Sequence, residues 1–444
     1  MNIINLFKTE TKKEASIMPM SEDFRKAAEP IIRSLAAKFG TPFYLYWEEG
    51  IVRNFQRLMD AYKDIPGFQE FFAVKALPNV VIMQLLSSLG CGFDLSSPWE
   101  LQLRKWAGIP IAKTYFSSNN TSRAAFLFTE EIGVEWLNLD DITLVPKVPD
   151  PFPEKISLRF NPGPERTGNF IIGDPAKAKY GHTLEQLIRS YKMCYDRGAR
   201  KFGLHTMICS NELNVDYHVE TVKMLLNLAR RIWEYTSRLI RLDHINQGGG
   251  IGLPYRPEQT EFDIYQLATR SKALLDQFRI NTGWAPKLFM ECGRYITGPY
   301  GVLVTKVINQ KHIYREYRGV DANTGADLLR AAIYDTAYHH ITVLNGEGRP
   351  TEKVCVTGAL CENNDYFATD RELPKMAEDD LLLIHDVGAH GQAMGNNYNG
   401  WPRHKELLLK PDGSVTLIRR DENFDDYIAT QSIDNTNWKP IREF

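Results

Sequence analysis

Between Pro42 and Gly298 the sequence alternates short apolar runs with longer segments whose apolar residues recur at helical spacing, such as Glu220–Arg238 and Glu261–Phe278. The short runs are predicted strands, and repeated strand–helix units are typical of a parallel α/β fold. About eight such units within roughly 250 residues predict a (β/α)8 TIM-type barrel, whose active site lies at the carboxyl ends of its strands. The predicted strands are Phe43–Trp47, Phe71–Val74, Gly92–Leu95, Thr114–Phe116, Trp136–Leu139, Ile156–Phe160, Lys201–Met207, His244–Asn246 and Lys287–Met290.

After Pro299 the pattern changes to strand-like runs separated by turns, with few helical segments. A chain of 444 residues also exceeds the size at which one core keeps growing, so two domains are expected. We predict an N-terminal extension over residues 1–40 that partly packs with the β domain, a barrel over 41–298 and a mainly β C-terminal domain over 299–444. Met1–Met20 is predicted to be flexible. The C-terminal strand-like runs are Gly301–Ile308, Val354–Val356, Leu381–Ile384 and Val415–Ile418.

The charge balance excludes several classes of partner. The chain has 53 Lys and Arg residues and 55 Asp and Glu residues. It therefore lacks the surplus of basic residues that would indicate nucleic acid or an anionic membrane as a partner. The apolar runs are far shorter than a membrane span, and Met1–Met20 lacks the apolar core of a signal peptide. The six cysteines contain no CxxC pair, which favours reduced thiols over a disulfide framework, and no metal site is expected. A cytoplasmic enzyme with a small-molecule substrate fits these properties.

Lys75 ends the apolar run that begins at Phe71, and the chain then breaks at Pro78-Asn79. Burial disfavours the charged form of a lysine, and a neutral amine can form a Schiff base with an aldehyde. Alternatively, the side chain reaches the rim or pairs with a carboxylate. This segment by itself does not decide between the two.

Other polar residues and glycines also follow predicted strands, so the barrel would bring them together with Lys75. Gly248-Gly249-Gly250 allows the backbone to approach an anion closely, although a tight structural turn would use the same residues. Glu291 and Arg294 form either a structural ion pair or a pair of ligand-binding groups. Asp94 lies at a strand end, while Glu100 is either part of an acidic pair with it or a first-turn carboxylate of a helix capped by Ser97.

The order of these motifs resembles that of the fold-type III pyridoxal-phosphate decarboxylases, and most closely the diaminopimelate decarboxylases among them. The resemblance extends from about Thr41 to about Tyr427. It implies pyridoxal 5'-phosphate as cofactor, the conversion of meso-2,6-diaminopimelate to L-lysine and CO2, and a homodimer with shared active sites. The similar segments are Phe71–Asn79, Ile245–Gly250, Met290–Arg294, Gly358–Asp365 and Gly388–His390.

The resemblance also implies roles for individual residues. Lys75 would hold the cofactor, and Glu291 would keep its pyridine nitrogen protonated. Cys361 would protonate the reacting carbon in the partner subunit's site. The cofactor-binding residues implied are Lys75, Asp94, Ser210, Gly248, Gly249, Gly250, Glu291, Cys292, Gly293, Arg294 and His390. The substrate-binding residues implied are Arg294, Arg330, Tyr334, Glu362 and His390.

Three positions depart from the family pattern. Cys292 stands where the family usually has proline. Met207 stands where a histidine usually stacks on the cofactor ring, and His205, two residues earlier on the same strand face, either compensates or is a satisfied core histidine. His390 stands for the usual tyrosine and would be shorter and pH-sensitive. These departures leave open a related substrate (ornithine, lysine or carboxynorspermidine) or a catalytically silent regulatory homologue.

Overall fold

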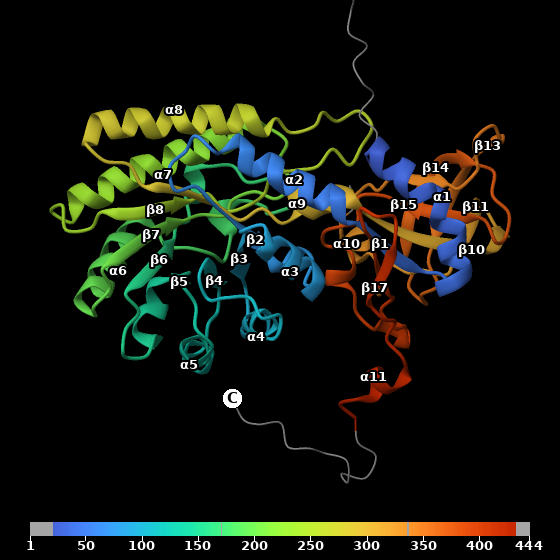
Figure 1. Ribbon diagram of the computed structural model, residues 1–444, viewed down its shortest axis with the longest axis horizontal. Coiled ribbons are helices and arrows are strands. Elements are labelled where there is room, and N and C mark those ends of the chain that lie inside the picture. The colour runs from blue at the N-terminus through green and yellow to red at the C-terminus, as the bar shows by residue number, and fades with distance from the viewer. Residues whose placement is uncertain (1–20, 170, 335–336, 432–444) are drawn as a thin grey trace, which may run out of the picture.

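The computed structural model describes residues 21–431 except 170 and 335–336, so the extension predicted to be flexible, Met1–Met20, lies outside the described residues. Figure 1 shows a barrel surrounded by helices beside a domain of mostly strands. This arrangement confirms the predicted fold class. No helix in the described part of the chain has the length and apolar character needed to span a bilayer.

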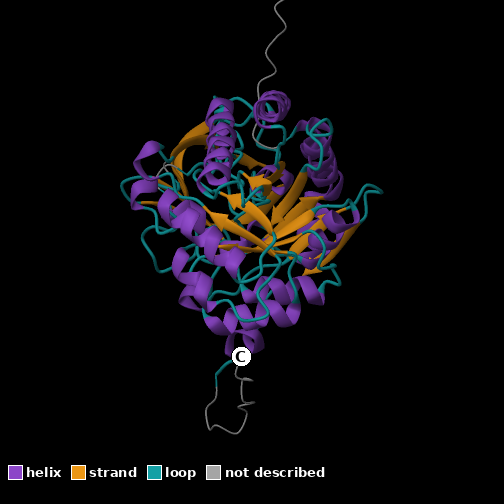
Figure 2. Ribbon diagram, turned by 90° about the vertical axis from the view of Figure 1, so that its left-hand side faces the viewer, coloured by secondary structure: helices purple, strands orange, loops and turns teal. Residues whose placement is uncertain are grey.

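Eight parallel strands close into the barrel, because β9 pairs with β2 through Gln69↔Phe289 and Glu70↔Met290. Helices surround these strands (Figure 2). The strands are β2 (Gln69–Ala73), β3 (Gly92–Leu95), β4 (Thr114–Ser118), β5 (Trp136–Leu139), β6 (Lys155–Arg159), β7 (Lys201–His205), β8 (Leu242–Asn246) and β9 (Lys287–Met290). The main helices are α2 (Glu48–Ala61), α3 (Val80–Ser88), α4 (Pro98–Trp106), α5 (Arg123–Ile132), α6 (Leu184–Asp196), α7 (Val215–Tyr235) and α8 (Ile264–Thr282).

Short polar side chains begin most of these helices. In each case the side chain before the first helical residue accepts a hydrogen bond from a backbone N–H of the first turn, a cap that typically stabilises a helix by about 1 kcal/mol. Ser97 caps α4 in this way, and Glu100 accepts from the N–H of Ser96 at 2.6 Å, which favours the first-turn role for Glu100. The capping residues are Asn79, Ser97, Ser122, Thr183, Asn214 and Asp263.

The interior of the barrel is apolar at one end and polar at the other. Phe71, Tyr115, Trp136 and Phe289 form a buried aromatic cluster, and the His244 ring stacks on Phe289 at 4.2 Å. Successive residues of a strand point to opposite faces of the sheet, so every second residue points into the barrel. Toward the carboxyl ends of the strands, these inward residues are polar. They are Asp94, Arg159, His205, Asn246 and Glu291, all buried.

Strand β1 (Phe43–Trp47), which we expected among the barrel strands, belongs to the other sheet. It pairs antiparallel with β10 (Gly301–His312) and parallel with β16 (Glu406–Leu409). All five residues of β1 are buried. A continuous apolar run indicates burial on both faces but not which sheet provides that burial, so the sequence pattern alone could not place this strand.

The second sheet follows the order β14-β13-β11-β10-β1-β16-β17, with β15 pairing to both β10 and β12. Helix α1 (Glu22–Phe39) packs on it through Phe24, Ala28, Ile32 and Leu35, which share a core cluster with Phe43, Val302 and Leu383. The remaining elements are β11 (Glu316–Val320), β12 (Ile341–Val343), β13 (Thr351–Thr357), β14 (Tyr366–Pro374), β15 (Leu381–Ile384), β17 (Val415–Arg419), α9 (Arg294–Thr297), α10 (Leu329–Ile333) and α11 (Phe424–Ile428).

Candidate active site

Lys75 lies in a short 3-10 turn, Val74–Ala76, directly after β2 and beyond the buried end of the strand. Its side chain is 48% exposed, and its Nζ lies 3.7 Å from Oδ2 of the buried Asp94. Burial and, to a smaller extent, the Glu291 charge raise the pKa of Asp94 to about 8, although Lys75 acts in the opposite direction. Neither carboxyl oxygen of Asp94 forms a hydrogen bond with the described residues. The amine and this carboxyl group are therefore both available to a ligand.

Glu291 follows β9 at the same end of the barrel and is fixed by two side chains. Its Oε1 accepts from Nδ2 of Asn246 at 2.8 Å, and its Oε2 lies 3.1 Å from Nε2 of His205. Burial opposes the charged form, but His205, Lys75 and Asn246 together outweigh it, so the pKa of Glu291 is lowered. The buried His205 ring therefore contacts the Glu291 carboxylate.

The glycine loop follows β8 and packs against Glu291 and β7. Gly248 and Gly250 have φ of 72° and 94°, in the region that favours glycine. A Cβ on Gly249 would lie 2.2 Å from the carbonyl oxygen of Glu291. The backbone N–H of Gly249 donates to Sδ of Met207 at 3.3 Å, so the Met207 side chain lies against this loop. Only glycine fits these positions, where the loop packs closely at the end of the barrel.

A buried carboxyl group accounts for a residue other than proline in Glu-Cys-Gly-Arg. The N–H of Cys292 donates to Oε1 of Glu70 at 2.6 Å, and Glu70 is completely buried. Burial raises the pKa of Glu70 well above its usual range, and the nearby Glu291 charge adds to this, so Glu70 is neutral while Glu291 is charged. A proline in place of Cys292 would have no N–H to donate. Cys292 and Glu70 therefore form one structural unit directly behind Glu291.

Gly293 and Arg294 complete this turn. A Cβ on Gly293 would lie 2.6 Å from Cβ of Ala76, so glycine allows the turn to approach the Lys75 segment. Arg294 is buried and donates to the hydroxyl of Tyr255. The guanidinium carbon of Arg330 lies 4.3 Å from the centroid of the same ring, and its Nη1 lies 3.1 Å from Nε2 of His339. Two arginines from separate domains thus meet around Tyr255.

A cavity of about 310 Å³ opens beside these arginines. Its lining includes Ser210 from the loop after β7, and Arg330 and Tyr334 from the region of α10. The structure therefore brings Ser210, predicted to bind the cofactor, and Arg330 and Tyr334, predicted to bind the substrate, to one cavity.

His390 also faces this group of cations. Its backbone N–H donates to the carbonyl of Ala76 at 2.9 Å, next to Lys75. Burial, together with Arg294, Lys75 and Arg330, lowers the pKa of His390 well below its usual range. The side chain is therefore neutral at physiological pH. These positive charges favour the neutral form of His390, which counts against the pH sensitivity that we predicted for it.

Cys361 and Glu362 lie apart from these residues. Both are exposed on the loop between β13 and β14, and neither lines the cavity beside Arg330. The N–H of Cys361 donates to Oδ1 of Asn399 at 2.9 Å, and Oε1 of Glu362 accepts from the N–H of Asn364 at 3.2 Å. The structure of one chain does not bring these two predicted site residues to Lys75.

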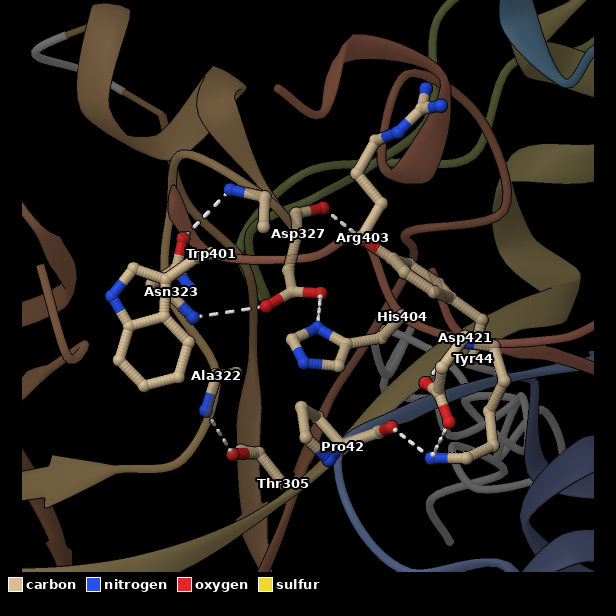
Figure 3. A network of polar contacts seen from close by, with 12 residues as sticks. Pro42, Tyr44, Thr305, Ala322, Asn323, Asp327, Trp401, Arg403, His404 and Asp421 are labelled. Atoms are coloured by element: carbon tan, nitrogen blue, oxygen red, sulfur yellow. Dashed lines mark hydrogen bonds and ion pairs between the residues drawn. The ribbon is translucent and has the colours of Figure 1, made fainter. Parts of the chain in front are cut away.

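The loop nevertheless has a fixed backbone, because it is joined to the segment before α10. The buried Asp365 accepts from the N–H groups of Thr324 at 2.7 Å and Leu360 at 2.8 Å. The residue before Thr324 is held by a second carboxylate: Oδ2 of Asp327 accepts from the N–H of Asn323 at 3.0 Å. The other oxygen of Asp327, Oδ1, lies 2.7 Å from Nδ1 of His404 (Figure 3). This buried network supports both the Cys361 loop and the helix that carries Arg330.

No role was predicted from the sequence for Asn246, Tyr255 or Glu70. Asn246 ends a strand directly before the glycine loop, and its position was a usable signal. The sequence contains weaker indications that Tyr255 and Glu70 belong to the site. Tyr255 is a tyrosine shortly after Gly252, and Glu70 is an acidic residue beside an apolar run. Their partners lie far away in sequence, so their contacts depend on the closed barrel.

Comparisons with known proteins agree with this geometry. Residues 48–298 match the family described as pyridoxal-dependent decarboxylase, pyridoxal binding domain. Protein TabA of Pseudomonas amygdali pv. tabaci is 40% identical over 428 residues, covering 96% of this chain and 98% of TabA. Diaminopimelate decarboxylase of Methanothermobacter thermautotrophicus is 34% identical, covering 90% of this chain and 93% of the relative. The structure of diaminopimelate decarboxylase from M. jannaschii in co-complex with L-lysine matches with a TM-score of 0.83 and 30% identity, covering 90% and 94% of the two chains.

The residues at the barrel end fit pyridoxal phosphate, the cofactor of this family. The Gly248–Gly250 loop, where a side chain would clash with neighbouring atoms, and the Ser210 hydroxyl suit a phosphate group. The charged Glu291 suits a protonated pyridine nitrogen, and the amine of Lys75 suits the aldehyde. Asp94 has hydrogen-bonding capacity left for a ligand.

Proposed function

Because the chain belongs to the pyridoxal-dependent decarboxylase family, we propose that it decarboxylates meso-2,6-diaminopimelate to L-lysine and CO2. One observation carries this choice of substrate. Arg294 and Arg330 meet around Tyr255, and among the described residues neither forms an ion pair with a carboxylate. A guanidinium pair of this kind binds a carboxylate strongly. The substrate would therefore carry a carboxylate besides the one that is lost.

Bound pyridoxal phosphate supplies the sink for the electron pair that the departing carboxylate leaves behind. Glu291, charged and fixed by Asn246 and His205, keeps a proton on the pyridine nitrogen. Lys75 provides the amine that holds the cofactor. Arg294, Arg330 and Tyr334 bind and orient the distal carboxylate, and the neutral His390 fills the space beside them without adding charge.

The proposal includes a homodimer with shared active sites. Cys361 and Glu362 are exposed on a loop whose backbone is held by Asp365. We infer that in the dimer Cys361 enters the partner's site, where its thiol protonates the reacting carbon and Glu362 binds the distal ammonium. All six cysteines are free thiols, which supports a reducing, cytoplasmic setting.

A related amino acid is the second candidate substrate. The 40% identity to TabA, together with Met207 and His390, supports this alternative, because small changes in a pocket redirect specificity on one scaffold. Such a substrate could be ornithine, lysine or carboxynorspermidine. A catalytically silent regulatory homologue would not need the intact arrangement of Lys75, Asp94 and Glu291.

Product analysis decides between these candidates. Purified protein with pyridoxal phosphate would be incubated with meso-diaminopimelate, L- and D-lysine, ornithine, arginine and carboxynorspermidine, and the amines and CO2 would be quantified. We expect lysine from diaminopimelate. Turnover of another substrate instead would contradict the proposed specificity, and no turnover of any would contradict the proposed function.

A further inference from the structure

His339 lies two residues before β12, and its side chain is almost completely buried behind Arg330. Its Nδ1 lies 2.8 Å from the backbone carbonyl oxygen of His385, the residue that directly follows β15. On the other side of the ring, Nε2 lies 3.1 Å from Nη1 of Arg330. The His339 ring therefore joins Arg330 to the backbone of the β-domain sheet, where β12 pairs with β15.

These two contacts determine where the His339 ring carries its hydrogen. A carbonyl oxygen only accepts a hydrogen bond, so Nδ1 carries the hydrogen, and a guanidinium N–H only donates, so Nε2 accepts. His339 is therefore neutral, in agreement with a pKa that burial and the Arg330 charge lower to about 3. A cofactor phosphate near Ser210, in the same cavity as Arg330, would raise this pKa, but Nε2 would still face a donor and would still have to accept.

A neutral partner leaves the charge of Arg330 available to a ligand. Arg330 is buried, and its Nε has no hydrogen-bond partner within the described residues. The His339 ring also meets the Tyr255 ring edge to face, with centroids 5.1 Å apart, and the Arg330 guanidinium carbon lies 4.3 Å from the centroid of Tyr255. Two neutral rings thus contact the guanidinium group without cancelling its charge. A carboxylate in place of His339 would form an ion pair with Arg330 and weaken its attraction for another carboxylate.

We propose that His339 is a positioning residue, which fixes the orientation of the Arg330 guanidinium while leaving its charge for the distal carboxylate of the substrate. This inference rests on the proposed function and deepens it, because it names a residue that sets the affinity for that carboxylate. His339 is not among the described residues that line the cavity, so it acts through Arg330. Holding a flexible arginine in place before the substrate arrives lowers the entropy cost of binding.

Calorimetric titration of the holoenzyme with L-lysine and cadaverine tests this role without turnover. L-Lysine, the expected product, keeps the distal carboxylate, and cadaverine is the same molecule without it. We expect the wild-type protein to bind L-lysine at least about tenfold more tightly than cadaverine, as a charge-assisted contact provides. This affinity ratio measures the contact between Arg330 and the carboxylate.

Three substitutions of His339 separate its acceptor from its lack of charge. H339L removes the acceptor and should reduce the ratio about fivefold, through weaker binding of L-lysine. H339Q places an amide oxygen near the position of Nε2 and should keep the ratio within about twofold of the wild-type value. H339E adds a negative charge beside Arg330 and should bring the ratio to about one. An unchanged ratio in H339L, or in H339E if H339L does not fold, would overturn the proposal. A ratio in H339Q as low as in H339L would also overturn it, because the acceptor would not be the cause.

His244 provides a matched control, because it is a buried histidine with a lowered pKa that packs against Phe289 at the apolar end of the barrel. H244Q should keep the wild-type ratio, and a loss of the ratio in this variant would count against the proposal. In turnover of diaminopimelate, H339L should raise KM about fivefold and leave kcat within about twofold, because Arg330 binds a group remote from the reacting carbon. A lower kcat with an unchanged KM would contradict a positioning role.

The titration also separates this inference from the proposed function. A wild-type protein that binds L-lysine no better than cadaverine would reject the carboxylate site on Arg330, and with it the choice of diaminopimelate as substrate. A wild-type preference for L-lysine that H339L and H339E leave unchanged would reject the role of His339 alone.

Discussion

The barrel end and the Cys361 loop contribute to the site in opposite ways. At the barrel end, the polar side chains contact one another: Glu291 is held by Asn246 and His205, and Lys75 lies beside Asp94. On the loop, the backbone is fixed through Asp365, but the Cys361 and Glu362 side chains are exposed. Within a single chain, the candidate cofactor-binding side chains thus contact one another, whereas the thiol and the carboxylate of the loop face outward. This difference is the reason why we propose that the loop acts on another copy of the chain.

The largest effect is expected at the barrel end, from Lys75→Ala. Removing the amine removes the group that holds the cofactor aldehyde, so decarboxylation should fall to background. Turnover of diaminopimelate and retention of cofactor on gel filtration would measure this. Lys223→Ala is the control, because Lys223 is an exposed lysine on α7 that pairs with Glu220. Substantial activity in the Lys75 variant would contradict the assigned role.

Cys361→Ala tests the other side of the comparison. Loss of a proton donor should lower kcat by about 100-fold or more, while cofactor binding stays unchanged. Mixing this variant with Lys75→Ala gives hybrid dimers in which one of the two sites has both residues intact. If sites are shared, random mixing should restore about a quarter of wild-type activity, because half of the dimers are hybrids with one intact site. No recovery on mixing would show that each chain works alone.

A smaller effect is expected behind Glu291, from Glu70→Leu. The buried N–H of Cys292 would lose its acceptor, which should lower the free energy of unfolding by about 1–3 kcal/mol and weaken pyridoxal phosphate binding. Glu70→Gln is the matched control: Glu70 is already neutral, and glutamine keeps an acceptor for the N–H. Chemical denaturation and cofactor titration would measure both variants. Equal losses in the two variants would show that the carboxyl group does more than accept this bond.

The smallest effect concerns the network behind the Cys361 loop. Burial disfavours charged His404, but its bond to Asp327 outweighs this and raises its pKa. A raised pKa in the folded state stabilises the protein fully below the ordinary histidine value of about 6.5, and this contribution is lost as pH rises through the folded value. His404→Gln should therefore cost about 1 kcal/mol at pH 6 and less at pH 9. Urea unfolding at both pH values would measure it. A cost that does not vary with pH would contradict a charged His404.

The sequence determined which residues occupy the carboxyl ends of the barrel strands. Lys75, the Gly248–Gly250 loop and Glu291 each follow a short apolar run, and Asp94 lies near the end of another. Parallel strands in a barrel must bring such positions to one end. The mainly β character of the C-terminal domain was also visible in its apolar runs. These features depend on local patterns, which a sequence shows directly.

Only the tertiary structure decided which residues contact one another at that end. It placed β1 in the second sheet, paired Glu70 with Cys292, and joined Arg294 and Arg330 around Tyr255. It also made His390 neutral, because cations from both domains surround it. The physical reason is shared by all four results: burial, charge and hydrogen-bond partners depend on segments that are distant in the chain and meet only when the barrel closes against the β domain.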